Sequence, residues 1–593
     1  MKPNGLHTIE QLQQRCQQNR HRGLVVVSGS QGYANKFAFT VQRALSQLDF
    51  HSINDPVTAT ALLGDETDSI IFNAYNGLNL NALAICAGTI KAGGLLVLLC
   101  PSLETWADFN DPEYERLLAH PYTAADVDGR FLQRFRQQLQ IDTHVLIINE
   151  KSQRCAFALP DQNNYQQTES PAPFANQQQA NAVKHIFSGI DKEHDITVVT
   201  ADRGRGKSAA LGLAAAELLQ QNHRHILLTA PSPKATQAVF KHASGNNIEN
   251  SKIRLSSEKS HLQFISPDDL VLNKPPAHLV FIDEAAALPV PVLLEILTHY
   301  PRAVLTTTVH GYEGTGRAFA ERFGKLLDQH GLAYSRLELE QPIRYASDDP
   351  LEAFIHRSLL LDSSVEAEEI ANQVHNNIEC SVVDRDILIS DEYVLREIFG
   401  LLMLAHYKTR PDDLRHLMDA PNLDLFIMKS DQGIVGTAMV AREGQLDNAL
   451  ITAIMAGKRR PKGHLLPQTL AFYCELPNAA TLSSARVIRI AIQPKLQRQG
   501  LGKQLLDFIE NHYQSRQTDL IGSSFGLEPG VLSFWQQAGY DCVRVGHKRH
   551  AASGYHSGLL LKSLSVTGAN IQQKAVYQYQ RANELSTAVE DKR

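Results

Sequence analysis

One short stretch of the chain permits very few folds, because a strand, a glycine-rich loop and a helix follow one another in it without interruption. Residues 195–200 form a run rich in β-branched side chains, which is typical of a strand. Residues 201–208 read Ala-Asp-Arg-Gly-Arg-Gly-Lys-Ser, and helical spacing continues from there to about residue 221. In such a loop the backbone amides bind phosphate groups, the lysine reaches the β- and γ-phosphates, and the serine binds Mg²⁺. The stretch therefore predicts a nucleotide-binding α/β domain.

The loop departs from the usual Gly-x4-Gly-Lys-Ser/Thr pattern at one position, where Ala201 replaces the first glycine. Alanine is the smallest possible replacement, and Gly204 adds backbone freedom inside the loop. A later apolar run ends in two carboxylates, of which Asp283 suits the binding of Mg²⁺ and Glu284 suits polarisation of the attacking water. The two motifs together, each at a strand end, predict ATP hydrolysis. The residues that would hold Mg²⁺ through the nucleotide are Ser208 and Asp283, and the catalytic pair is Lys207 and Glu284.

Two further residues fit a RecA-like core of the helicase kind. Gln179 lies one helix ahead of the loop, where helicase-like ATPases read adenine, although a solvated glutamine is an alternative. Arg317 ends a glycine-rich stretch and is expected to reach the γ-phosphate, unless it is a plain surface arginine. After residues 341–345 no second RecA-like lobe follows. ATP is therefore expected to drive a local conformational step and not translocation along a strand.

Composition limits the class of protein. A chain of 593 residues holds about three to four domains of ordinary size. Its net charge of −6 restricts any nucleic-acid site to a local basic patch. The seven cysteines are scattered without a Cys-x-x-Cys pair, so neither a zinc site nor a disulfide framework is indicated. The polar stretch 1–22 does not look like a secretory signal, and no apolar run reaches membrane-spanning length. We therefore expect a cytoplasmic protein that needs no obligate protein partner.

The organisation along the chain is that of a multidomain α/β protein. Residues 1–150 alternate strands and helices, which predicts a parallel sheet. The polar stretch 151–174 reads as a linker, and 175–375 contain the RecA-like P-loop ATPase domain. Residues 376–564 form the third domain, and 565–593 a short polar C-terminal tail. Strands are expected at 23–28, 68–72 and 94–100, with helices at 78–92 and around 571–582. The glycine-rich turn at 28–32 lacks a following Gly-Lys-Ser/Thr and is interpreted as a plain turn.

The third domain contains a second strand–loop–helix unit. Residues 487–492 form a short β-branched run that Pro494 ends, since proline cannot donate to a sheet ladder. The string Gln-x-x-Gly-x-Gly at 497–502 follows, and Leu505 begins an apolar repeat at helical spacing. Bare amides at a helix N-terminus can bind a pyrophosphate. The pattern resembles the acetyl-CoA loop of the GNAT acetyltransferases, although a glycine turn without function is the alternative.

The surrounding elements match the GNAT order. A hairpin is expected at 424–429 and 433–441, a late strand at 520–525, and a short helix at 531–538. Two basic segments lie inside this domain and suit phosphate contact and base stacking, unless they are solvated loops. The predicted RNA-binding residues are Lys458, Arg459, Arg460, Lys462, Lys548 and Arg549.

Five strings together resemble the tRNA(Met) cytidine acetyltransferase family, and the likeness covers nearly the whole chain. They lie at residues 200–208, 311–317, 342–345, 489–492 and 553–557. The resemblance implies a bacterial-type enzyme that acetylates the N4 amine of cytidine, most often the wobble cytidine of elongator tRNA(Met). It further implies acetyl-CoA as donor, ATP or GTP with Mg²⁺ as the hydrolysed nucleotide, and tRNA contact by the C-terminal tail, which is shorter here than in the family.

The same resemblance assigns residues to the two sites. The nucleotide site comprises Gln179, Ala201, Asp202, Arg203, Gly204, Arg205, Gly206, Lys207, Ser208, Ala209, Ala210, Asp283 and Arg317. The acetyl-CoA site comprises Ile490, Ala491, Ile492, Gln497, Arg498, Gln499, Gly500, Leu501, Gly502, Lys503 and, less directly, Glu528.

The chemistry of the acceptor limits what the site must supply. The N4 amine of cytidine is neutral but weakly nucleophilic, so orientation and oxyanion stabilisation matter more than prior deprotonation. Amides near 490–492 are expected to bind the thioester oxygen, and water or a nearby histidine to accept the proton. His550 and His556 are the candidates by sequence, with a phosphate contact or a structural role as the alternative for each. Two other functions remain open from the sequence. One is a protein or small-molecule acetyltransferase regulated by its ATPase, and the other is an ATP-dependent RNA remodeller.

Overall fold

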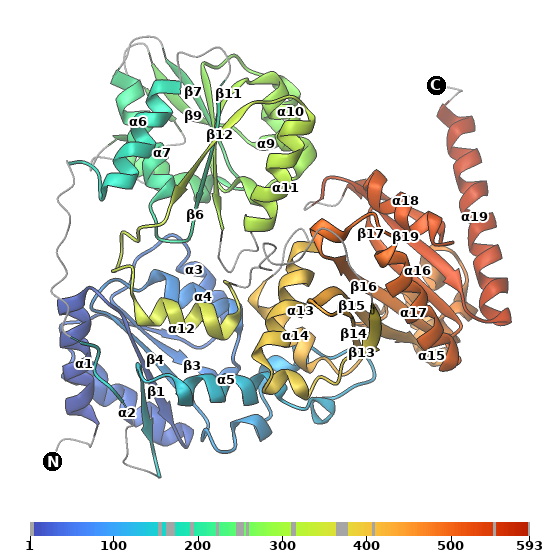
Figure 1. Cartoon of the computed structure of the whole chain (residues 1–593), viewed down its shortest axis with the longest axis horizontal. Helices are drawn as coiled ribbons and strands as arrows, with labels where there is room; N and C mark the ends of the chain where they lie inside the picture. Colours follow the sequence, from blue (N-terminus) through green and yellow to red (C-terminus); the bar gives the residue numbers. More distant parts are fainter. Residues whose placement is uncertain are drawn as a thin grey trace. The chain divides into compact units, whose positions relative to one another are not determined.

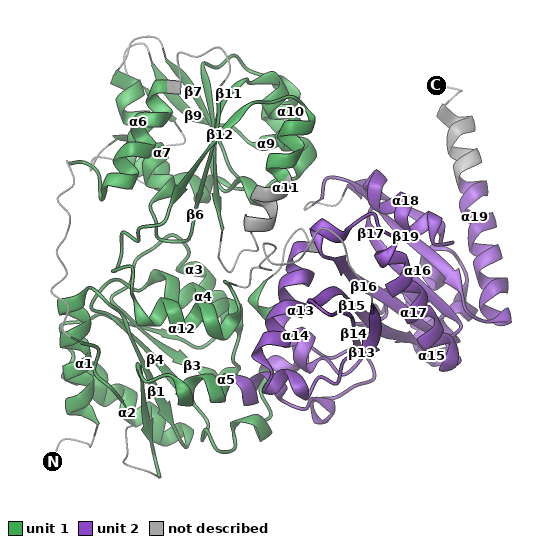
Figure 2. Ribbon diagram, viewed as in Figure 1, with its two compact units in different colours: residues 1–112, 135–362, 407–412 green, residues 113–134, 363–406, 413–593 purple. Residues whose placement is uncertain are grey.

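The structure is a computed structural model that describes most of the chain. The described residues are 5–151, 157–161, 172–189, 195–220, 224–244, 254–256, 260–309, 316–362, 377–405, 410–549 and 553–590. They form two compact units, shown in different colours in Figure 2. Unit 1 comprises residues 1–112, 135–362 and 407–412, and unit 2 comprises residues 113–134, 363–406 and 413–593. Within the described residues, no helix is both long enough and apolar enough to cross a bilayer.

The first sheet of unit 1 is parallel throughout, with the strand order β2-β3-β4-β1-β5 (Figure 1). Its strands are β1 (Gly23–Ser28), β2 (Phe50–Ile53), β3 (Ser69–Asn73), β4 (Leu95–Cys100) and β5 (Val145–Asn149). The nearby helices are α1 (Leu6–Asn19), α2 (Gln31–Ala44), α3 (Pro56–Ala61), α4 (Leu80–Thr89) and α5 (Arg130–Ile141). Both central strands are fully buried, as parallel strands covered by helices are. The predicted parallel α/β fold of this region is confirmed, and Ser30 simply caps α2.

The second sheet of unit 1 has the order β12-β6-β11-β10-β7-β9-β8, and only β8 is antiparallel to its neighbour. Its strands are β6 (Asp195–Ala201), β7 (His225–Thr229), β8 (Arg254–Ser256), β9 (His261–Phe264), β10 (Leu279–Ile282), β11 (Arg302–Thr308) and β12 (Tyr334–Leu339). The helices are α6 (Gln177–Gly189), α7 (Lys207–Gln220), α8 (Gln237–Ser244), α9 (Pro267–Asn273), α10 (Val290–His299) and α11 (Gly316–Gln329). The order places β11 between the glycine-loop strand β6 and the acidic strand β10. Two buried clusters supply the core on either side of these strands.

Helix α12 (Pro350–Leu359) follows the second sheet in sequence but packs with the first. It contacts α4 and β1. Its Phe354 ring lies 5.8 Å from Phe135, which lies 5.9 Å from Trp106, and both pairs meet edge to face. Because these aromatic rings are buried, the contacts fix α12 to the N-terminal sheet. The predicted division at residue 150 and residue 375 stays a prediction, and α12 is the element that connects the two sheets of unit 1.

Unit 2 is built on a seven-stranded sheet of order β13-β14-β15-β16-β17-β19-β18. Its strands are β13 (Glu379–Val382), β14 (Leu423–Ser430), β15 (Gly433–Gly444), β16 (Ser483–Ile492), β17 (Leu520–Gly526), β18 (Asp541–Arg549) and β19 (His556–Ser563). Every neighbouring pair is antiparallel except β16 and β17. The predicted β14–β15 hairpin, the strand before the glycine loop and the late strand–helix are all present. The helices are α13 (Glu392–Ala405), α14 (Pro411–Asp419), α17 (Leu501–Ser515) and α18 (Pro529–Gln537).

Two helices between β15 and β16 were not expected from the sequence. They are α15 (Asn448–Met455) and α16 (Leu465–Tyr473). One apolar cluster joins α16 to β17, β18 and β19 and to the last helix, α19 (Val566–Glu590). The predicted helix at 571–582 lies inside α19, whose Ile571 and Ala575 are buried. Part of the expected polar tail is therefore docked on the sheet by two apolar side chains.

Candidate functional site

The glycine loop of unit 1 connects β6 to α7, as the sequence predicts. Gly204 and Gly206 have φ values of +80° and +82°, which L side chains rarely adopt. A Cβ atom on Gly206 would lie 2.2 Å from Ile343 Cδ1 and 2.9 Å from Gln179 Nε2, so only glycine fits. Ala201 is different, because it is the last residue of β6 and is buried. It is not among the residues with positive φ, which explains why alanine is tolerated there.

Gln179 is buried beneath the loop and braces it. Its side-chain Oε1 accepts from the backbone N–H of Ala175 at 2.9 Å, and Nε2 lies 3.3 Å from the Gly206 carbonyl, to which it donates. Both ends of the amide are therefore engaged within the protein. Recognition of adenine by Gln179 stays a prediction.

The acidic pair after β10 meets the loop lysine. Lys207 Nζ lies 2.7 Å from Glu284 Oε1, and Glu284 has a left-handed φ of +53°. Asp283 Oδ1 accepts from the hydroxyl of Thr306. Asp283 Oδ2 is buried and has no hydrogen-bond partner among the described residues. An unsatisfied carboxylate oxygen near Ser208 fits the oxygen ligands that Mg²⁺ requires, so the residues present suit a Mg²⁺–nucleotide complex.

The two carboxyl groups have opposite pKa shifts. Burial and the neighbouring charge of Glu284 raise the pKa of Asp283. Burial also acts to raise the pKa of Glu284, but the charge and hydrogen bond of Lys207 outweigh it and hold that pKa below its ordinary value. Glu284 therefore stays ionised to a lower pH than Asp283, which suits a residue that polarises an attacking water.

Two threonines that the sequence analysis left without a role complete this site. Thr306 and Thr308 lie at the end of β11, between the loop strand and the acidic strand. Thr306 donates to Asp283, and the Thr308 hydroxyl donates to Glu284 Oε2 at 3.2 Å. The sequence shows only a run of three threonines at 306–308, and the strand order is needed to show which carboxylates they reach.

Arg205 points its side chain away from the expected nucleotide position. Its Nη1 and Nη2 lie 2.8 and 3.0 Å from the two carboxylate oxygens of Glu352 on α12, and Nε donates to the Glu340 carbonyl at 2.9 Å. Burial alone would lower the pKa of Arg205, but the hydrogen bonds and charge of Glu352 raise it. A bidentate buried pair of this kind is a geometric clamp. The Arg205 side chain is therefore engaged within the protein, and its predicted contact with phosphate could involve only its backbone.

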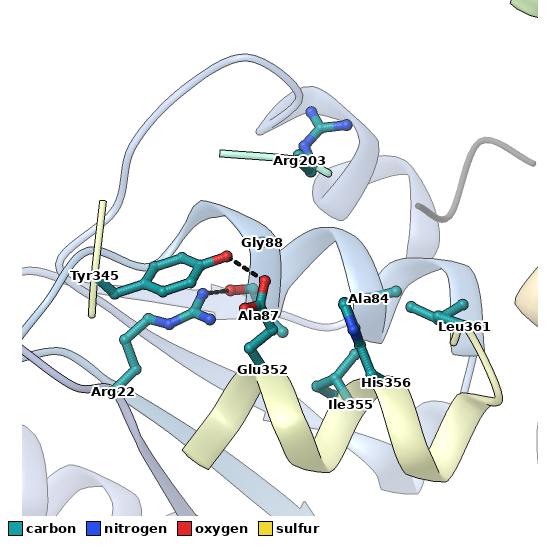
Figure 3. A pocket seen from close by; sticks show the side chains of 10 residues that line it. All are labelled: Arg22, Ala84, Ala87, Gly88, Arg203, Tyr345, Glu352, Ile355, His356 and Leu361. Atoms are coloured by element: carbon teal, nitrogen blue, oxygen red, sulfur yellow. Dashed lines mark hydrogen bonds between the residues drawn. The ribbon is translucent and has the colours of Figure 1, made fainter. Parts of the chain in front are cut away.

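The clamp continues into the first sheet. The hydroxyl of Tyr345 donates to Glu352 at 2.7 Å, and the guanidinium carbon of Arg22 lies 3.5 Å from the centre of the Tyr345 ring. Arg22 itself is fully buried, pairs with Asp349 at 2.9 Å and donates to the Ala87 carbonyl. Figure 3 shows Arg22, Tyr345 and Glu352 among the residues that line a small pocket, together with Arg203 of the glycine loop. The loop and the N-terminal sheet are thus joined by one continuous polar network.

Two predicted residues cannot be placed. Arg317 lies in the first turn of α11, but its side chain and residues 310–315 fall outside the described part of the chain. His550 also lies outside the described residues. Their proposed roles stay predictions.

The acetyl-CoA site predicted in unit 2 coincides with an opening in the sheet. Parallel pairing of β16 with β17 extends only from Ser484 to Arg486, opposite 520–522. At the end of this pairing Ser523 donates its hydroxyl to the Val487 carbonyl at 2.9 Å, in place of a ladder bond. A register shift against β15 leaves Ile488 as an extra residue, and such bulges bend a strand. Beyond Val487 the two strands no longer pair, and we call this opening the β16–β17 wedge.

Backbone amides line the wedge. Gln493 donates its N–H to the Val435 carbonyl of β15 at 2.9 Å. Because successive residues of a strand alternate sides, the N–H groups of Ile492 and Ile490 point away from β15 and toward the wedge. Free amides at this position fit a thioester oxygen.

The loop after β16 presents a helix N-terminus. Gly500, with φ of +84°, is the N-cap of α17, and no side chain caps the helix. Nothing lies within 4 Å of a Cβ built on Gly500, whereas one on Gly502 would meet the Phe534 ring at 3.2 Å. Gln497 closes the loop by donating to the Ile492 carbonyl at 3.1 Å. The loop thus offers open space and bare amides where a pyrophosphate would bind.

Other predicted residues surround the end of β17. Glu528 is the exposed N-cap of α18, and its charge acts with burial to raise the pKa of Tyr555. The Nδ1 atom of His556 lies 2.8 Å from the Gly546 carbonyl, and the backbone carbonyl of His556 accepts from Leu527 N–H. His556 is thus held beside the end of β17.

The basic residues divide into two groups. Lys458, Arg459, Arg460, Lys548 and Arg549 are exposed. Lys462 is also exposed, but its Nζ donates to the carbonyls of Glu115 and Arg116, at 2.9 Å to the former, and desolvation lowers its pKa. Lys462 therefore joins residues 113–134 to the rest of unit 2, and its predicted contact with RNA stays a prediction.

Comparison with known protein families covers all three regions. A model described as tRNA(Met) cytidine acetyltransferase TmcA, N-terminal, matches residues 1–150. One described as RNA cytidine acetyltransferase NAT10/TcmA, helicase domain, matches residues 198–362, and GNAT acetyltransferase 2 matches residues 397–520.

Similar curated proteins extend over most of the chain. A tRNA(Met) cytidine acetyltransferase TmcA of Nitrosococcus halophilus is 42% identical over 522 residues, which cover 86% of this chain and 70% of that protein. The protein of the same name from Salmonella typhimurium is 31% identical over 591 residues, covering 98% and 82% respectively. That of Haloferax volcanii is 34% identical over 553 residues, covering 88% and 72%.

The clamp generates a first prediction. Glu352→Gln leaves the buried Arg205 guanidinium without its carboxylate, so the free energy of unfolding should fall by roughly 3 kcal/mol and KM for ATP should rise. The control is Glu295→Gln, which removes an exposed partner of Lys274 and should cost less than about 0.5 kcal/mol. Thermal and urea unfolding together with ATPase kinetics measure both effects. Equal stability of the two variants would contradict the clamp.

The acetyl-CoA loop generates a second prediction. Gly502→Glu forces a side chain against Phe534 and places a carboxylate in the first turn of α17, so acetyl-CoA affinity should fall at least tenfold, roughly 1.4 kcal/mol. Calorimetric titration with acetyl-CoA tests this. The matched control is Gly32→Glu on α2, where a Cβ meets nothing within 4 Å and affinity should not change. ATP hydrolysis should survive in both variants, and unchanged acetyl-CoA binding by Gly502→Glu would rule out this loop.

Proposed function

Because the chain belongs to the tRNA(Met) cytidine acetyltransferase family, we propose that it transfers the acetyl group of acetyl-CoA to the N4 amine of a cytidine in tRNA, at the expense of ATP. The specific target proposed is the wobble cytidine of elongator tRNA(Met), because the names of the relatives specify a cytidine of tRNA(Met). The observation that carries the proposal is the joint presence of two sites in one chain. These are the Lys207–Glu284–Asp283 group in unit 1 and the β16–β17 wedge with its glycine loop in unit 2.

The wedge suits acyl transfer to a weak nucleophile. The cytidine amine attacks the thioester carbon, the carbon–sulfur bond breaks, and the sulfur leaves as a thiolate or thiol. The N–H groups of Ile490 and Ile492 are placed to donate to the oxygen on which negative charge develops. Removing one preorganised donor of this kind typically costs about 3 kcal/mol of transition-state stabilisation. The protein therefore needs to orient the amine more than to deprotonate it beforehand.

His556 is proposed as the acceptor of the proton that the amine loses. Its Nδ1 is engaged with the Gly546 carbonyl, and this hydrogen bond requires that Nδ1 carries the proton. The other ring nitrogen, Nε2, is then the unprotonated one and can accept. The position of His556 beside the end of β17 supports this role.

The ATPase is proposed to act before the chemical step. A base in the anticodon loop must be unstacked before it can be acetylated, which costs a few kcal/mol. Thioester transfer does not itself require ATP, so hydrolysis at Lys207 and Glu284 is assigned to exposing the base. The nucleotide loop is connected to the N-terminal sheet through Arg205 and Glu352 of α12. A movement of the loop on hydrolysis would therefore be transmitted to α12.

We place this reaction in the cytoplasm. The cysteines of the described chain are free thiols, most of them buried, as in proteins of a reducing compartment. Acetyl-CoA, ATP and tRNA are the partners that the two sites require.

The function is tested with labelled acetyl-CoA, purified tRNA and Lys207→Ala. The wild-type protein should acetylate cytidine in tRNA only with ATP present. Lys207→Ala should lose ATP hydrolysis and most acetylation of folded tRNA, yet retain acetyl-CoA affinity and acetylate a short RNA whose cytidine is already unstacked. Lys234→Ala, an exposed lysine outside the loop, is the control. If label enters protein and no cytidine, the proposed substrate is wrong. If Lys207→Ala fails equally on both RNAs, ATP does not serve base exposure.

The proton acceptor is tested by two substitutions of His556. Asparagine retains a donor near the position of Nδ1 and lacks Nε2, so His556→Asn should lower kcat about 10²-fold with little change in KM for tRNA. His556→Gln places an amide nearer the position of Nε2 but cannot accept a proton at neutral pH, so it should show the same loss. A rise in KM with unchanged kcat would instead indicate a phosphate contact.

A further inference from the structure

Two large aromatic side chains stand exposed at the end of α16 in unit 2. Phe472 is 36% exposed and Tyr473 is 49% exposed, although Leu466 and Leu470 of the same helix are buried in the sheet. The rings of Phe472 and Tyr473 meet edge to face, with centroids 4.9 Å apart and an interplanar angle of 88°. Two adjacent, partly exposed rings form a small apolar surface that can contact a ligand.

A cation from the edge strand covers one of these rings. The guanidinium carbon of Arg544 on β18 lies 3.7 Å from the centre of the Tyr473 ring. Arg544 is held in register by pairing with Leu559 of β19. A guanidinium plane over an aromatic face is itself a stacking surface for a planar ligand. We call Phe472, Tyr473 and Arg544 the aromatic platform.

Basic residues lie on two sides of the aromatic platform. The exposed run Lys458-Arg459-Arg460 directly follows Gly457, and a Cβ built on Gly457 would lie 3.8 Å from the Phe472 ring. His547, Lys548 and Arg549 are exposed further along β18. The exposed acidic residue nearest in sequence is Glu475. Such a concentration of cations contrasts with the net charge of −6 of the whole chain. Charge complementarity therefore points to a polyanion.

The platform is connected to the β16–β17 wedge through the sheet. β18 is the edge strand, and its Arg549 pairs with His556 of β19. The next residue of β19, Ser557, pairs with Gly526 at the end of β17, beside the wedge. Arg544 and Arg549 pair with Leu559 and His556, which are three residues apart on β19, so they are separated by about 10 Å along the sheet. A single strand of RNA lying along β18 thus spans a few nucleotides between the platform and the wedge.

We propose that the aromatic platform stacks an unpaired nucleobase of the tRNA substrate, a few nucleotides from the cytidine that is acetylated. This inference rests on the proposed function and adds a binding site to it. Unpaired bases are recognised by stacking on aromatic rings and guanidinium planes, while lysines and arginines contact the phosphates. The platform supplies the first kind of contact and the two basic groups supply the second. A protein partner would not need cations on both sides of the rings.

Affinity for tRNA is the first measurement. The double variant Phe472→Ala/Tyr473→Ala should weaken binding of tRNA about 5- to 100-fold, which is the range for removing one or two stacked bases. It should leave acetyl-CoA affinity and RNA-free ATP hydrolysis unchanged, which also shows that the variant is folded. Tyr473→Phe retains the ring and should bind nearly as wild type. The control is Phe39→Ala on α2, since Phe39 is 60% exposed and also lies beside an arginine, with Arg43 at 6.0 Å.

Salt dependence separates the platform from the basic groups. Replacing Lys458, Arg459 and Arg460 by alanine should lower the slope of log K against log salt by about two to three, because each phosphate contact contributes about 0.7–0.9. The aromatic variant should lower affinity without changing that slope. A changed slope in the aromatic variant would mean that the rings act only by orienting charges, and would overturn stacking.

Fluorescence reports the stacking directly. The only tryptophans of the chain, Trp106 and Trp535, are buried, so Tyr473→Trp introduces the one exposed indole. Its emission should be quenched by tRNA beyond any change seen in the wild type. If the wild type acetylates tRNA but tRNA leaves this emission and the affinity of the double variant unchanged, the platform is wrong and the function stands. If the wild type neither binds nor acetylates tRNA, the proposed function fails and the platform with it.

Discussion

A bidentate ion pair between Arg205 and Glu352 holds unit 1 together at its functional centre. Arg205 belongs to the glycine loop, and Glu352 belongs to a helix that packs on the other sheet. Neither charge is tolerable in a buried position without the other, since an unpaired buried ion costs several kcal/mol. The pair therefore fixes the position of the loop backbone relative to α12. Gly206, Gln179 and the Lys207 side chain all depend on that position.

The carboxyl ends of three parallel strands, β6, β10 and β11, meet at this centre. Because β11 lies between β6 and β10, its threonines hydrogen-bond to Asp283 and Glu284 while Lys207 pairs with Glu284. The site is thus charged on both sides and stabilised without a ligand. A bound Mg²⁺–nucleotide would compete with Glu284 for Lys207, which gives the nucleotide a means to alter the position of the loop and, through Arg205, of α12.

Unit 2 depends on an interruption of its sheet and not on a buried ion pair. Its sheet is antiparallel except for one short parallel pair, and the absence of further pairing between β16 and β17 leaves backbone amides for a ligand. The bulge at Ile488 and the hydroxyl of Ser523 maintain this separation. On the far edge of the same sheet, β18 carries two arginines and a lysine beside two exposed rings. One sheet therefore carries the proposed acyl-transfer site and a surface suited to a polyanion.

The sequence by itself determined the elements that carry chemistry. Strand–loop–helix spacing located the glycine loops at 201–208 and 497–502, and the hairpin and parallel strands followed from periodicity, because these signals are local. The sequence could not assign Arg205, whose position in the loop suggested the nucleotide, since its partner Glu352 lies 147 residues away. It also could not show that Lys462 binds carbonyls of residues 115 and 116, or that Thr308 reaches Glu284. Residues 458–460 and 544–549 read as two separate basic segments, and only the folding of α16 against β18 places Phe472 and Tyr473 between them. Such contacts arise from the strand order and from packing between distant segments, which tertiary structure alone decides.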